Sequence, residues 1–169
     1  MKNIISLFLV LAAYTTSAQF NHIPTDSFTI EGKVKHAVTF SLADLDTFKT
    51  KALPDVIITD HMGKVKDTLT LLKGILLKDI LNNVQIDAEP PKMLSAYYFV
   101  LVASDNYKIV FSWNELFNTE TGNNVYTITE EGKKMQDTDD RISIVALTDI
   151  RTGRRHMSNI QKIIVARAE

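Results

Sequence analysis

Residues 97–117 have the sequence YYFVLVASDNYKIVFSWNELF, and this stretch decides the fold. Two runs rich in β-branched and aromatic residues, 97–103 and 108–112, flank Asp105 and Asn106. Such runs around a short polar pair are typical of a β-hairpin. Asn accepts a positive φ better than most residues, which suits it to the turn. The stretch therefore predicts two antiparallel strands.

A helix is expected directly after this hairpin. Ser112 stands three residues before Glu115, which is the spacing of a capping box, and predicts a helix over 113–117. Ser41 and Asp44 repeat this spacing ahead of another short helix.

The rest of the chain continues in the same style, with short apolar runs between turn signals. The runs predict one hairpin at 27–34 and 38–40, a second at 55–59 and 65–70 around a turn at 60–63, strands at 124–129 and 142–147, a strand at 160–166 that closes the sheet, and a helix at 76–81. The nearly all-apolar run 142–147 is expected to be buried, and Pro90-Pro91 is expected in a loop. Because long helices do not alternate with strands, the pattern predicts a single α+β domain, mixed and dominated by sheet.

The N-terminus has the pattern of a secretory signal. Lys2 precedes an apolar run over 4–13, and small residues follow at 16–18. The run is far shorter than the ~20 residues that span a bilayer, and no second such run follows. We therefore expect residues 1–18 to be a signal peptide and 19–169 to form a domain in the periplasm or outside the cell, with no integral membrane segment after cleavage.

Composition limits the classes of partner. The chain has 19 basic and 20 acidic residues and no cysteine. This balance gives no electrostatic reason to expect nucleic acid or an anionic membrane as partner. A domain of about 150 residues buries roughly two-thirds of its unfolded surface, so it can be stable without disulfides. The sequence also has no nucleophile elbow, HExxH, paired CxxC, Walker loop or dinucleotide fingerprint.

Several motifs occur in an order that is known from one family. They are KGILLKDIL at 73–81, ASDNY at 103–107 with FS at 111–112 and EL at 115–116, GKKM at 132–135, RISIV at 141–145, GRRHM at 153–157 and IIV at 163–165. Together they resemble the oxidoreductase molybdopterin-binding domain, which has the sulfite-oxidase-type fold. The resemblance spans about residues 28–165. It implies that fold, and it makes molybdopterin the cofactor to consider.

The chain departs from this family at the metal. The resemblance places the family's molybdenum-ligating cysteine at the end of the third strand, where this chain has Thr59-Asp60-His61-Met62-Gly63. A soft thiolate ligand cannot be replaced by another residue type without changing the metal chemistry. The resemblance therefore implies an exported single-domain member that lacks the molybdenum ligand.

The resemblance also implies a cleft in which arginines hold a pterin phosphate or an anionic substrate, since guanidinium groups suit bidentate contacts to anions. The residues expected to line this cleft are Asp60, His61, Gly63, Arg141, Arg154, Arg155 and His156. The alternatives are turn chemistry for Asp60, an exposed turn position for His61, and a solvated turn around Gly153 for the arginines. The four histidines show no ligand spacing, so no metal site is expected.

Three functions follow from this pattern. The first is a non-catalytic or degenerate family member that binds a small anionic ligand, with a pterin as one candidate. The first alternative is a molybdopterin-dependent oxidoreductase with non-cysteine contacts to the cofactor. The second alternative is a periplasmic accessory protein whose sheet surface docks a partner.

Overall fold

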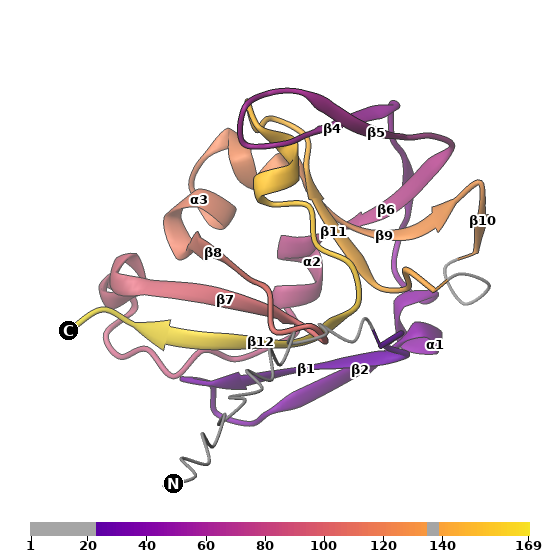
Figure 1. Ribbon diagram of the computed structural model, residues 1–169. Helices are drawn as coiled ribbons and strands as arrows, with labels where there is room; N and C mark the ends of the chain where they lie inside the picture. The colour runs from indigo at the N-terminus through magenta and orange to yellow at the C-terminus, as the bar shows by residue number, and fades with distance from the viewer. Residues whose placement is uncertain (1–22, 135–138) are drawn as a thin grey trace, which may run out of the picture.

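Two five-stranded sheets form the body of the protein in the computed structural model, which describes residues 23–134 and 139–169 (Figure 1). The expected signal peptide and cleavage point lie outside the described residues. The first sheet has the order β2-β1-β12-β7-β8. β1 and β12 are parallel and the other neighbours are antiparallel, so the sheet is mixed. Its strands are β1 (Ser27–Gly32), β2 (Val38–Ser41), β7 (Tyr97–Ala103), β8 (Lys108–Ser112) and β12 (Ile160–Arg167).

The second sheet is antiparallel and has the order β10-β9-β6-β3, with β11 also paired to β9. Its strands are β3 (Lys51–Ala52), β6 (Leu72–Leu76), β9 (Val125–Glu131), β10 (Lys133–Lys134) and β11 (Ser143–Ala146). A separate two-stranded hairpin, β4 (Val56–Thr59) and β5 (Val65–Leu69), lies over this sheet at the top of Figure 1.

The helices are short and begin where the sequence predicts. Ser41 and Ser112 both form complete capping boxes, with Asp44 and Glu115 as their partners. Each box satisfies two backbone N–H groups that a helix start leaves unpaired. The helices are α1 (Leu42–Leu45), α2 (Leu77–Leu81) and α3 (Trp113–Phe117), and the 3₁₀ turns are η1 (Pro91–Ala96), η2 (Glu120–Asn123) and η4 (Thr152–Arg154). Within the described residues, none of these helices is long and apolar enough to cross a bilayer.

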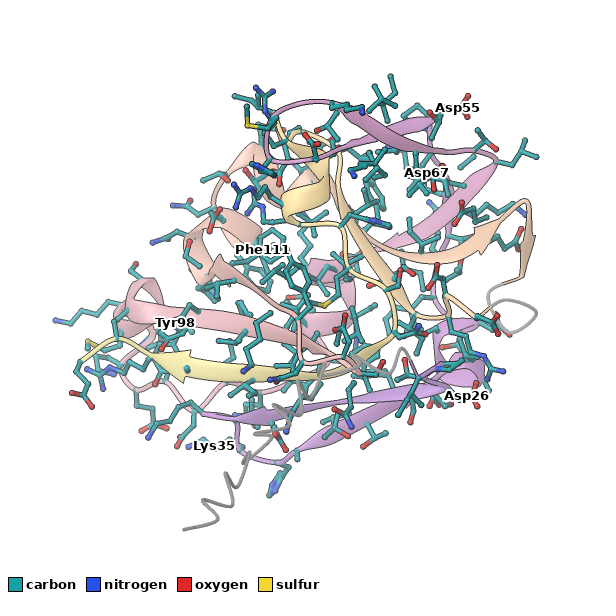
Figure 2. The ribbon with its side chains drawn as sticks, viewed as in Figure 1. Asp26, Lys35, Asp55, Asp67, Tyr98 and Phe111 are labelled. Carbon is teal, nitrogen blue, oxygen red and sulfur yellow. The ribbon has the colours of Figure 1, made fainter. Side chains whose placement is uncertain are left out.

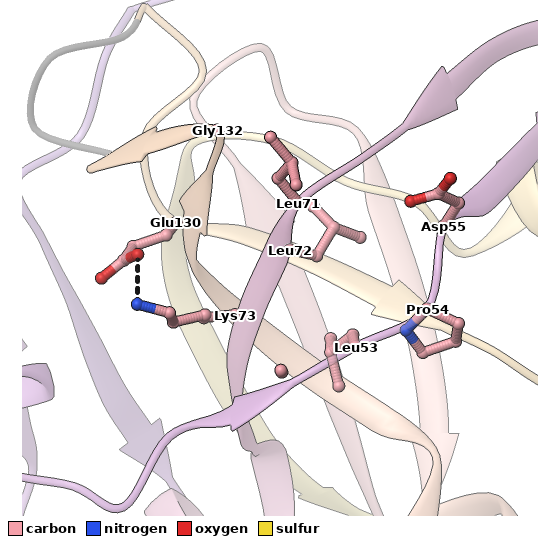
Figure 3. A pocket seen from close by; sticks show the side chains of 9 residues that line it. Leu53, Pro54, Asp55, Leu71, Leu72, Lys73, Glu130 and Gly132 are labelled. Atoms are coloured by element: carbon pink, nitrogen blue, oxygen red, sulfur yellow. Dashed lines mark ion pairs between the residues drawn. The ribbon is translucent and has the colours of Figure 1, made fainter.

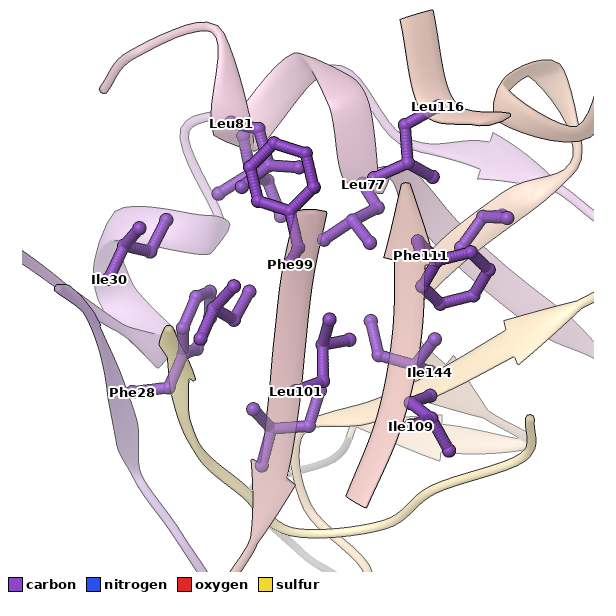
Figure 4. Packing of buried hydrophobic residues seen from close by; sticks show 14 of the residues in the cluster. Phe28, Ile30, Leu77, Leu81, Phe99, Leu101, Ile109, Phe111, Leu116 and Ile144 are labelled. Atoms are coloured by element: carbon purple, nitrogen blue, oxygen red, sulfur yellow. The ribbon is translucent and has the colours of Figure 1, made fainter. Parts of the chain in front are cut away.

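Two apolar clusters explain the layering. The larger cluster lies between the two sheets and is covered by α2 and α3, with Phe28, Phe99, Phe111 and Ile144 among its fully buried members (Figure 4). The smaller cluster packs the β4–β5 hairpin onto the other face of the second sheet; it contains Val56, Ile58, Leu69, Leu72, Tyr126, Ile128 and Val145. The second sheet is thus covered on both faces, which is why all four residues of β11 are buried.

The structure confirms the expected α+β class and most of the predicted elements, and it corrects two of them. β12 does not close the first sheet at an edge, since it lies between β1 and β7. The Pro90-Pro91 region leads into the 3₁₀ turn η1 rather than a plain loop. The sequence reasoning also missed β6, which occupies an interior position of the second sheet, because Gly74 interrupts its apolar pattern.

Candidate functional site

The 60–63 turn and the segment around η4 are joined, as the resemblance implied. The Thr152 hydroxyl accepts a hydrogen bond from the Thr59 amide at 3.0 Å and donates one to the Ile57 carbonyl at 2.6 Å. One side chain thereby satisfies two backbone groups on the free edge of β4, as a neighbouring strand would. Two segments that are about 90 residues apart in the chain thus form one rigid corner of the molecule.

Two glycines allow this close approach. A Cβ at Gly153 would lie 2.4 Å from the Thr59 carbonyl oxygen, and one at Gly63 would lie 2.8 Å from the Arg151 Cζ. Gly63 also has a φ of 88°, which disfavours other residues. Gly63 therefore belongs to this corner, as expected, but its role is to let Arg151 pack against the turn.

Asp60 has the role of a turn residue. Its Oδ1 accepts hydrogen bonds from the amides of Met62 at 2.8 Å and Lys64 at 3.0 Å. Hydrogen bonding to these amides, with that from Lys64 as the main cause, lowers the pKa of the carboxyl group. His61 is exposed at the tip of the same turn. The carboxylate of Asp60 is thus already bonded, whereas the imidazole of His61 is open to a ligand.

Arg154 is the open cation of the corner. It is exposed, and among the residues that the structure describes its guanidinium group has no hydrogen-bonded or ionic partner. Its backbone is fixed, because its carbonyl accepts a hydrogen bond of 2.9 Å from the Tyr107 hydroxyl. Arg154 therefore presents a free charge from an anchored backbone.

The guanidinium group of Arg155, by contrast, is bonded to other side chains of the fold. Its guanidinium group donates two hydrogen bonds to Asp149, at 2.8 and 2.5 Å, and one of 3.0 Å to Glu115. It also lies 4.4 Å from the centre of the Phe111 ring. The hydrogen bond to Asp149 is the main cause of a raised pKa for this guanidinium group. The expectation that Arg155 binds an anion is therefore corrected: two carboxylates already neutralise it, and it ties the η4 segment to the start of α3.

Arg141 does not join the corner either. It forms an ion pair with Asp26, and its amide donates a hydrogen bond of 2.9 Å to the Asn159 side chain. Figure 2 shows Asp26 far from the β4–β5 hairpin. Because Arg141 precedes β11 whereas η4 follows it, the two lie toward opposite ends of that strand. The expected cleft is thus wrong where it includes Arg141.

His156 faces a negatively charged environment. Burial lowers the pKa of its imidazole, and the charges of Asp140 and Asp67 offset part of that effect. The expected contact of His156 with an anion stays a prediction. No group of three or more histidine or acidic side chains within the described ranges is arranged to hold a metal ion.

The sequence reasoning missed Arg151 and Thr152, although it placed a turn around Gly153. Thr152 could not have been identified, because a lone threonine in a turn carries no signal of the strand edge that it covers. Contacts of Thr152 with Thr59 and of Gly63 with Arg151 join the two segments, which we name the turn–η4 corner (residues 59–64 and 151–154). Of the expected site residues, Asp60, His61 and Gly63 lie on its first segment and Arg154 on its second.

Comparisons with known proteins show a likeness of fold. No protein-family model and no curated protein matches the sequence. Among solved structures, the sulfane dehydrogenase SoxCD from Paracoccus pantotrophus is similar, with a TM-score of 0.58 and 10% sequence identity over 82% of this chain and 37% of that chain. The fold is thus sulfite-oxidase-like. At this identity the likeness shows a distant relationship of fold alone, and the chain spans little more than a third of that protein.

The residues of the corner do not fit a molybdenum centre. The whole sequence contains no cysteine, so no thiolate can stand there. The Thr59 hydroxyl is buried without a hydrogen-bond partner among the described residues, and Asp60 is bonded to backbone amides. These are hard oxygen donors, unlike the soft sulfur that the family uses. Arg155, which follows the corner, is already paired with Asp149 and Glu115.

Proposed function

We propose that this chain is an exported, non-catalytic protein that binds a small oxyanion at the turn–η4 corner. The observation that carries the proposal is a contrast between Arg154, whose guanidinium group has no partner among the described residues, and the carboxylates of Asp60 and Asp149, which are bonded. Asp60 is bonded to two amides and Asp149 to Arg155. The charge that Arg154 adds to the corner is therefore not offset by these two carboxylates.

Neighbouring basic residues also favour the binding of an anion. Lys64 and Arg151 are exposed on the two joined segments, and His61 is exposed between them. Charge-assisted hydrogen bonds from arginine to an oxyanion are among the stronger polar contacts in proteins. A fixed backbone under a free guanidinium group favours such contacts, because less freedom is lost on binding.

The affinity of purified protein for inorganic phosphate and sulfate at low salt tests this proposal. Arg154→Gln should weaken binding at least about tenfold, since a hydrogen bond to a charged group contributes about 1.5–3 kcal/mol. Arg154→Lys should recover only part of the affinity, because it keeps the charge but loses the planar fork. Arg167→Gln removes the same charge from the exposed end of β12 and is the matched control. Equal affinities for wild type and Arg154→Gln would refute the proposal.

Export is the second part of the proposal. It is supported by the apolar run over 4–13 and the small residues at 16–18. The mass of the protein recovered from the exported fraction should correspond to a chain that begins at Gln19. An intact Met1 in that fraction would contradict cleavage.

A partner protein is the second candidate for the same corner. Four large apolar side chains are exposed on the β4–β5 hairpin and just before η4: Ile57 at 52%, Met62 at 75%, Val65 at 57% and Ile150 at 86%. Apolar side chains mixed with cations are common at protein interfaces. If a partner binds here, Met62→Ser should abolish its co-purification, whereas Val110→Ser on β8, also exposed, should not.

A further inference from the structure

A surface pocket of about 400 Å³ lies beside β6, and the proposed anion site does not use it. Figure 3 shows Leu53, Leu71 and Leu72 between an ion pair on one side and Asp55 on the other. The volume falls in the lower part of the ~300–1,000 Å³ range of small-molecule sites. Such sites are mostly apolar with a few polar groups, which is the composition found here.

The backbone of Leu71, which lines this pocket, is strained. Its φ is 53°, in the left-handed region that branched residues avoid, and its side chain is 75% exposed. Hydrogen bonds fix the backbone on both sides: the Gly132 amide donates to the Leu71 carbonyl at 3.2 Å, and the Leu53 amide donates to the Leu72 carbonyl at 2.9 Å. Asn or Gly would relieve the strain and remove the exposed apolar surface. Backbone strain of this kind is concentrated at ligand sites.

The pocket carries one uncompensated charge. Glu130 is neutralised by Lys73, whose Nζ lies 2.8 Å from the Glu130 carboxylate. Asp55 is exposed at the opposite side, and it has no ionic or hydrogen-bonded partner within the part of the chain that the structure describes. A ligand in this pocket therefore meets apolar side chains and a free negative charge.

We infer that this pocket binds a small apolar molecule with a cationic end group, such as an arylalkylamine. The apolar part contacts Leu53, Pro54 and Leu71, and the ammonium group lies near Asp55. This sign is opposite to that of the anion site, so the two sites select different ligands. The inference does not depend on the proposed function.

Titration of the protein with phenethylamine, and with 3-phenylpropionate as a probe of the same shape and opposite charge, tests the inference. The amine should bind saturably and at least about tenfold more tightly than the carboxylate. Asp55→Asn should remove this preference. Leu71→Asn should weaken amine binding by about tenfold, because it removes the exposed apolar contact; a tenfold change corresponds to about 1.4 kcal/mol.

The variants are chosen to leave the fold intact. Asn adopts the left-handed conformation more readily than Leu, so Leu71→Asn should not destabilise the protein. Ile23→Asn removes an equally large side chain that is 58% exposed outside the pocket, and it should leave amine affinity unchanged. Unchanged affinity in Leu71→Asn, equal binding of the two probes, or the same loss in Ile23→Asn would overturn the inference.

Discussion

Arg154 and Arg155 show how neighbouring residues of one type take different roles. Arg155 donates hydrogen bonds to Asp149 and Glu115, whereas the side chain of Arg154 projects without a partner among the described residues. Sequence reasoning treated both as ligand-binding residues, because charge and spacing cannot distinguish them. Only the positions of Asp149, Glu115 and the Phe111 ring make the distinction.

Arg155→Met should lower the free energy of unfolding by about 2–3 kcal/mol. The carboxylate of Asp149, which is 12% exposed, would lose the partner that offsets its burial. Adding Asp149→Leu should restore much of the stability, because no buried charge is then left unpaired. Urea unfolding of both variants measures this. A loss below about 0.5 kcal/mol in the single variant would show that the pair behaves as a surface salt bridge.

Thr127→Val should raise the free energy of unfolding by about 1 kcal/mol. Thr127 is fully buried on β9, and its hydroxyl has no hydrogen-bond partner among the described residues. Its cross-strand neighbours are Ile75 and Ile144, so a methyl group suits the site better than a hydroxyl. Thr129→Val, on the same strand, loses a hydrogen bond to the Lys73 carbonyl and should give no gain. Destabilisation by Thr127→Val would indicate that the hydroxyl is satisfied.

At the scale of elements, local signals predicted the hairpins and capped helices well. The capping boxes at Ser41 and Ser112 are complete, and Asn106 has the positive φ of 68° that its turn position suggested. The misses arose where tertiary packing outweighs local pattern. β6 contains Gly74, and a Cβ built at this position would lie 3.0 Å from the Thr127 carbonyl oxygen. Sheet packing, and not strand propensity, therefore favours a glycine in that strand.

The candidate site was predictable only in part, for a related reason. The resemblance placed the 60–63 turn near Arg141 and the 154–156 segment, whereas the hydrogen bond that the structure shows joins Thr59 to Thr152, just before that segment. It could not predict the surroundings of Arg141 and His156. Arg141 is paired with Asp26, and the charge of Asp67 acts on His156, and both aspartates are distant in the sequence. Such contacts between distant segments carry no sequence signal.

Two titratable groups, His156 and Glu131, should have opposite effects on how the stability of the fold changes with pH. Burial lowers the pKa of His156, so the unfolded chain binds a proton more tightly and stability is lost as the pH falls below about 6.5. The pKa of Glu131 is raised, first by burial and then by Asp67 and Asp140, so its carboxylate destabilises the fold above about pH 4.5.

Urea midpoints at pH 5 and pH 7 test these signs. His156→Gln should reduce the loss of stability on acidification. Glu131→Gln should raise stability at pH 7 more than at pH 5. A shift of the pH dependence in the same direction by both variants would contradict the assigned environments.

At the scale of the whole molecule there are three layers: the first sheet, the second sheet and the β4–β5 hairpin. The hairpin is the outer layer on the side of the second sheet. The smaller apolar cluster holds it on the second sheet, and Thr152 covers its free edge. The hairpin thus brings residues 59–64 to a fixed position beside η4. In this arrangement the fold positions the corner that we propose binds an anion, without the thiolate that the resembled enzymes use.

Protein purified from a cell that makes molybdopterin should contain no stoichiometric molybdenum and should not turn over sulfite or a sulfoxide. The reason is the donor set: a bonded carboxylate, a buried hydroxyl and an exposed imidazole cannot supply the soft ligand of the family. Elemental analysis and a turnover assay measure this. One molybdenum per chain with turnover would require a different ligand set.

The binding corner itself is tested most directly by an NMR titration of the protein's backbone amides with sodium phosphate, at an ionic strength held constant with sodium chloride. We predict saturable shifts confined to residues 59–64 and 151–155, which disappear in Arg154→Gln and persist in Arg167→Gln. Shifts that do not saturate, or saturable shifts elsewhere on the surface, would contradict it.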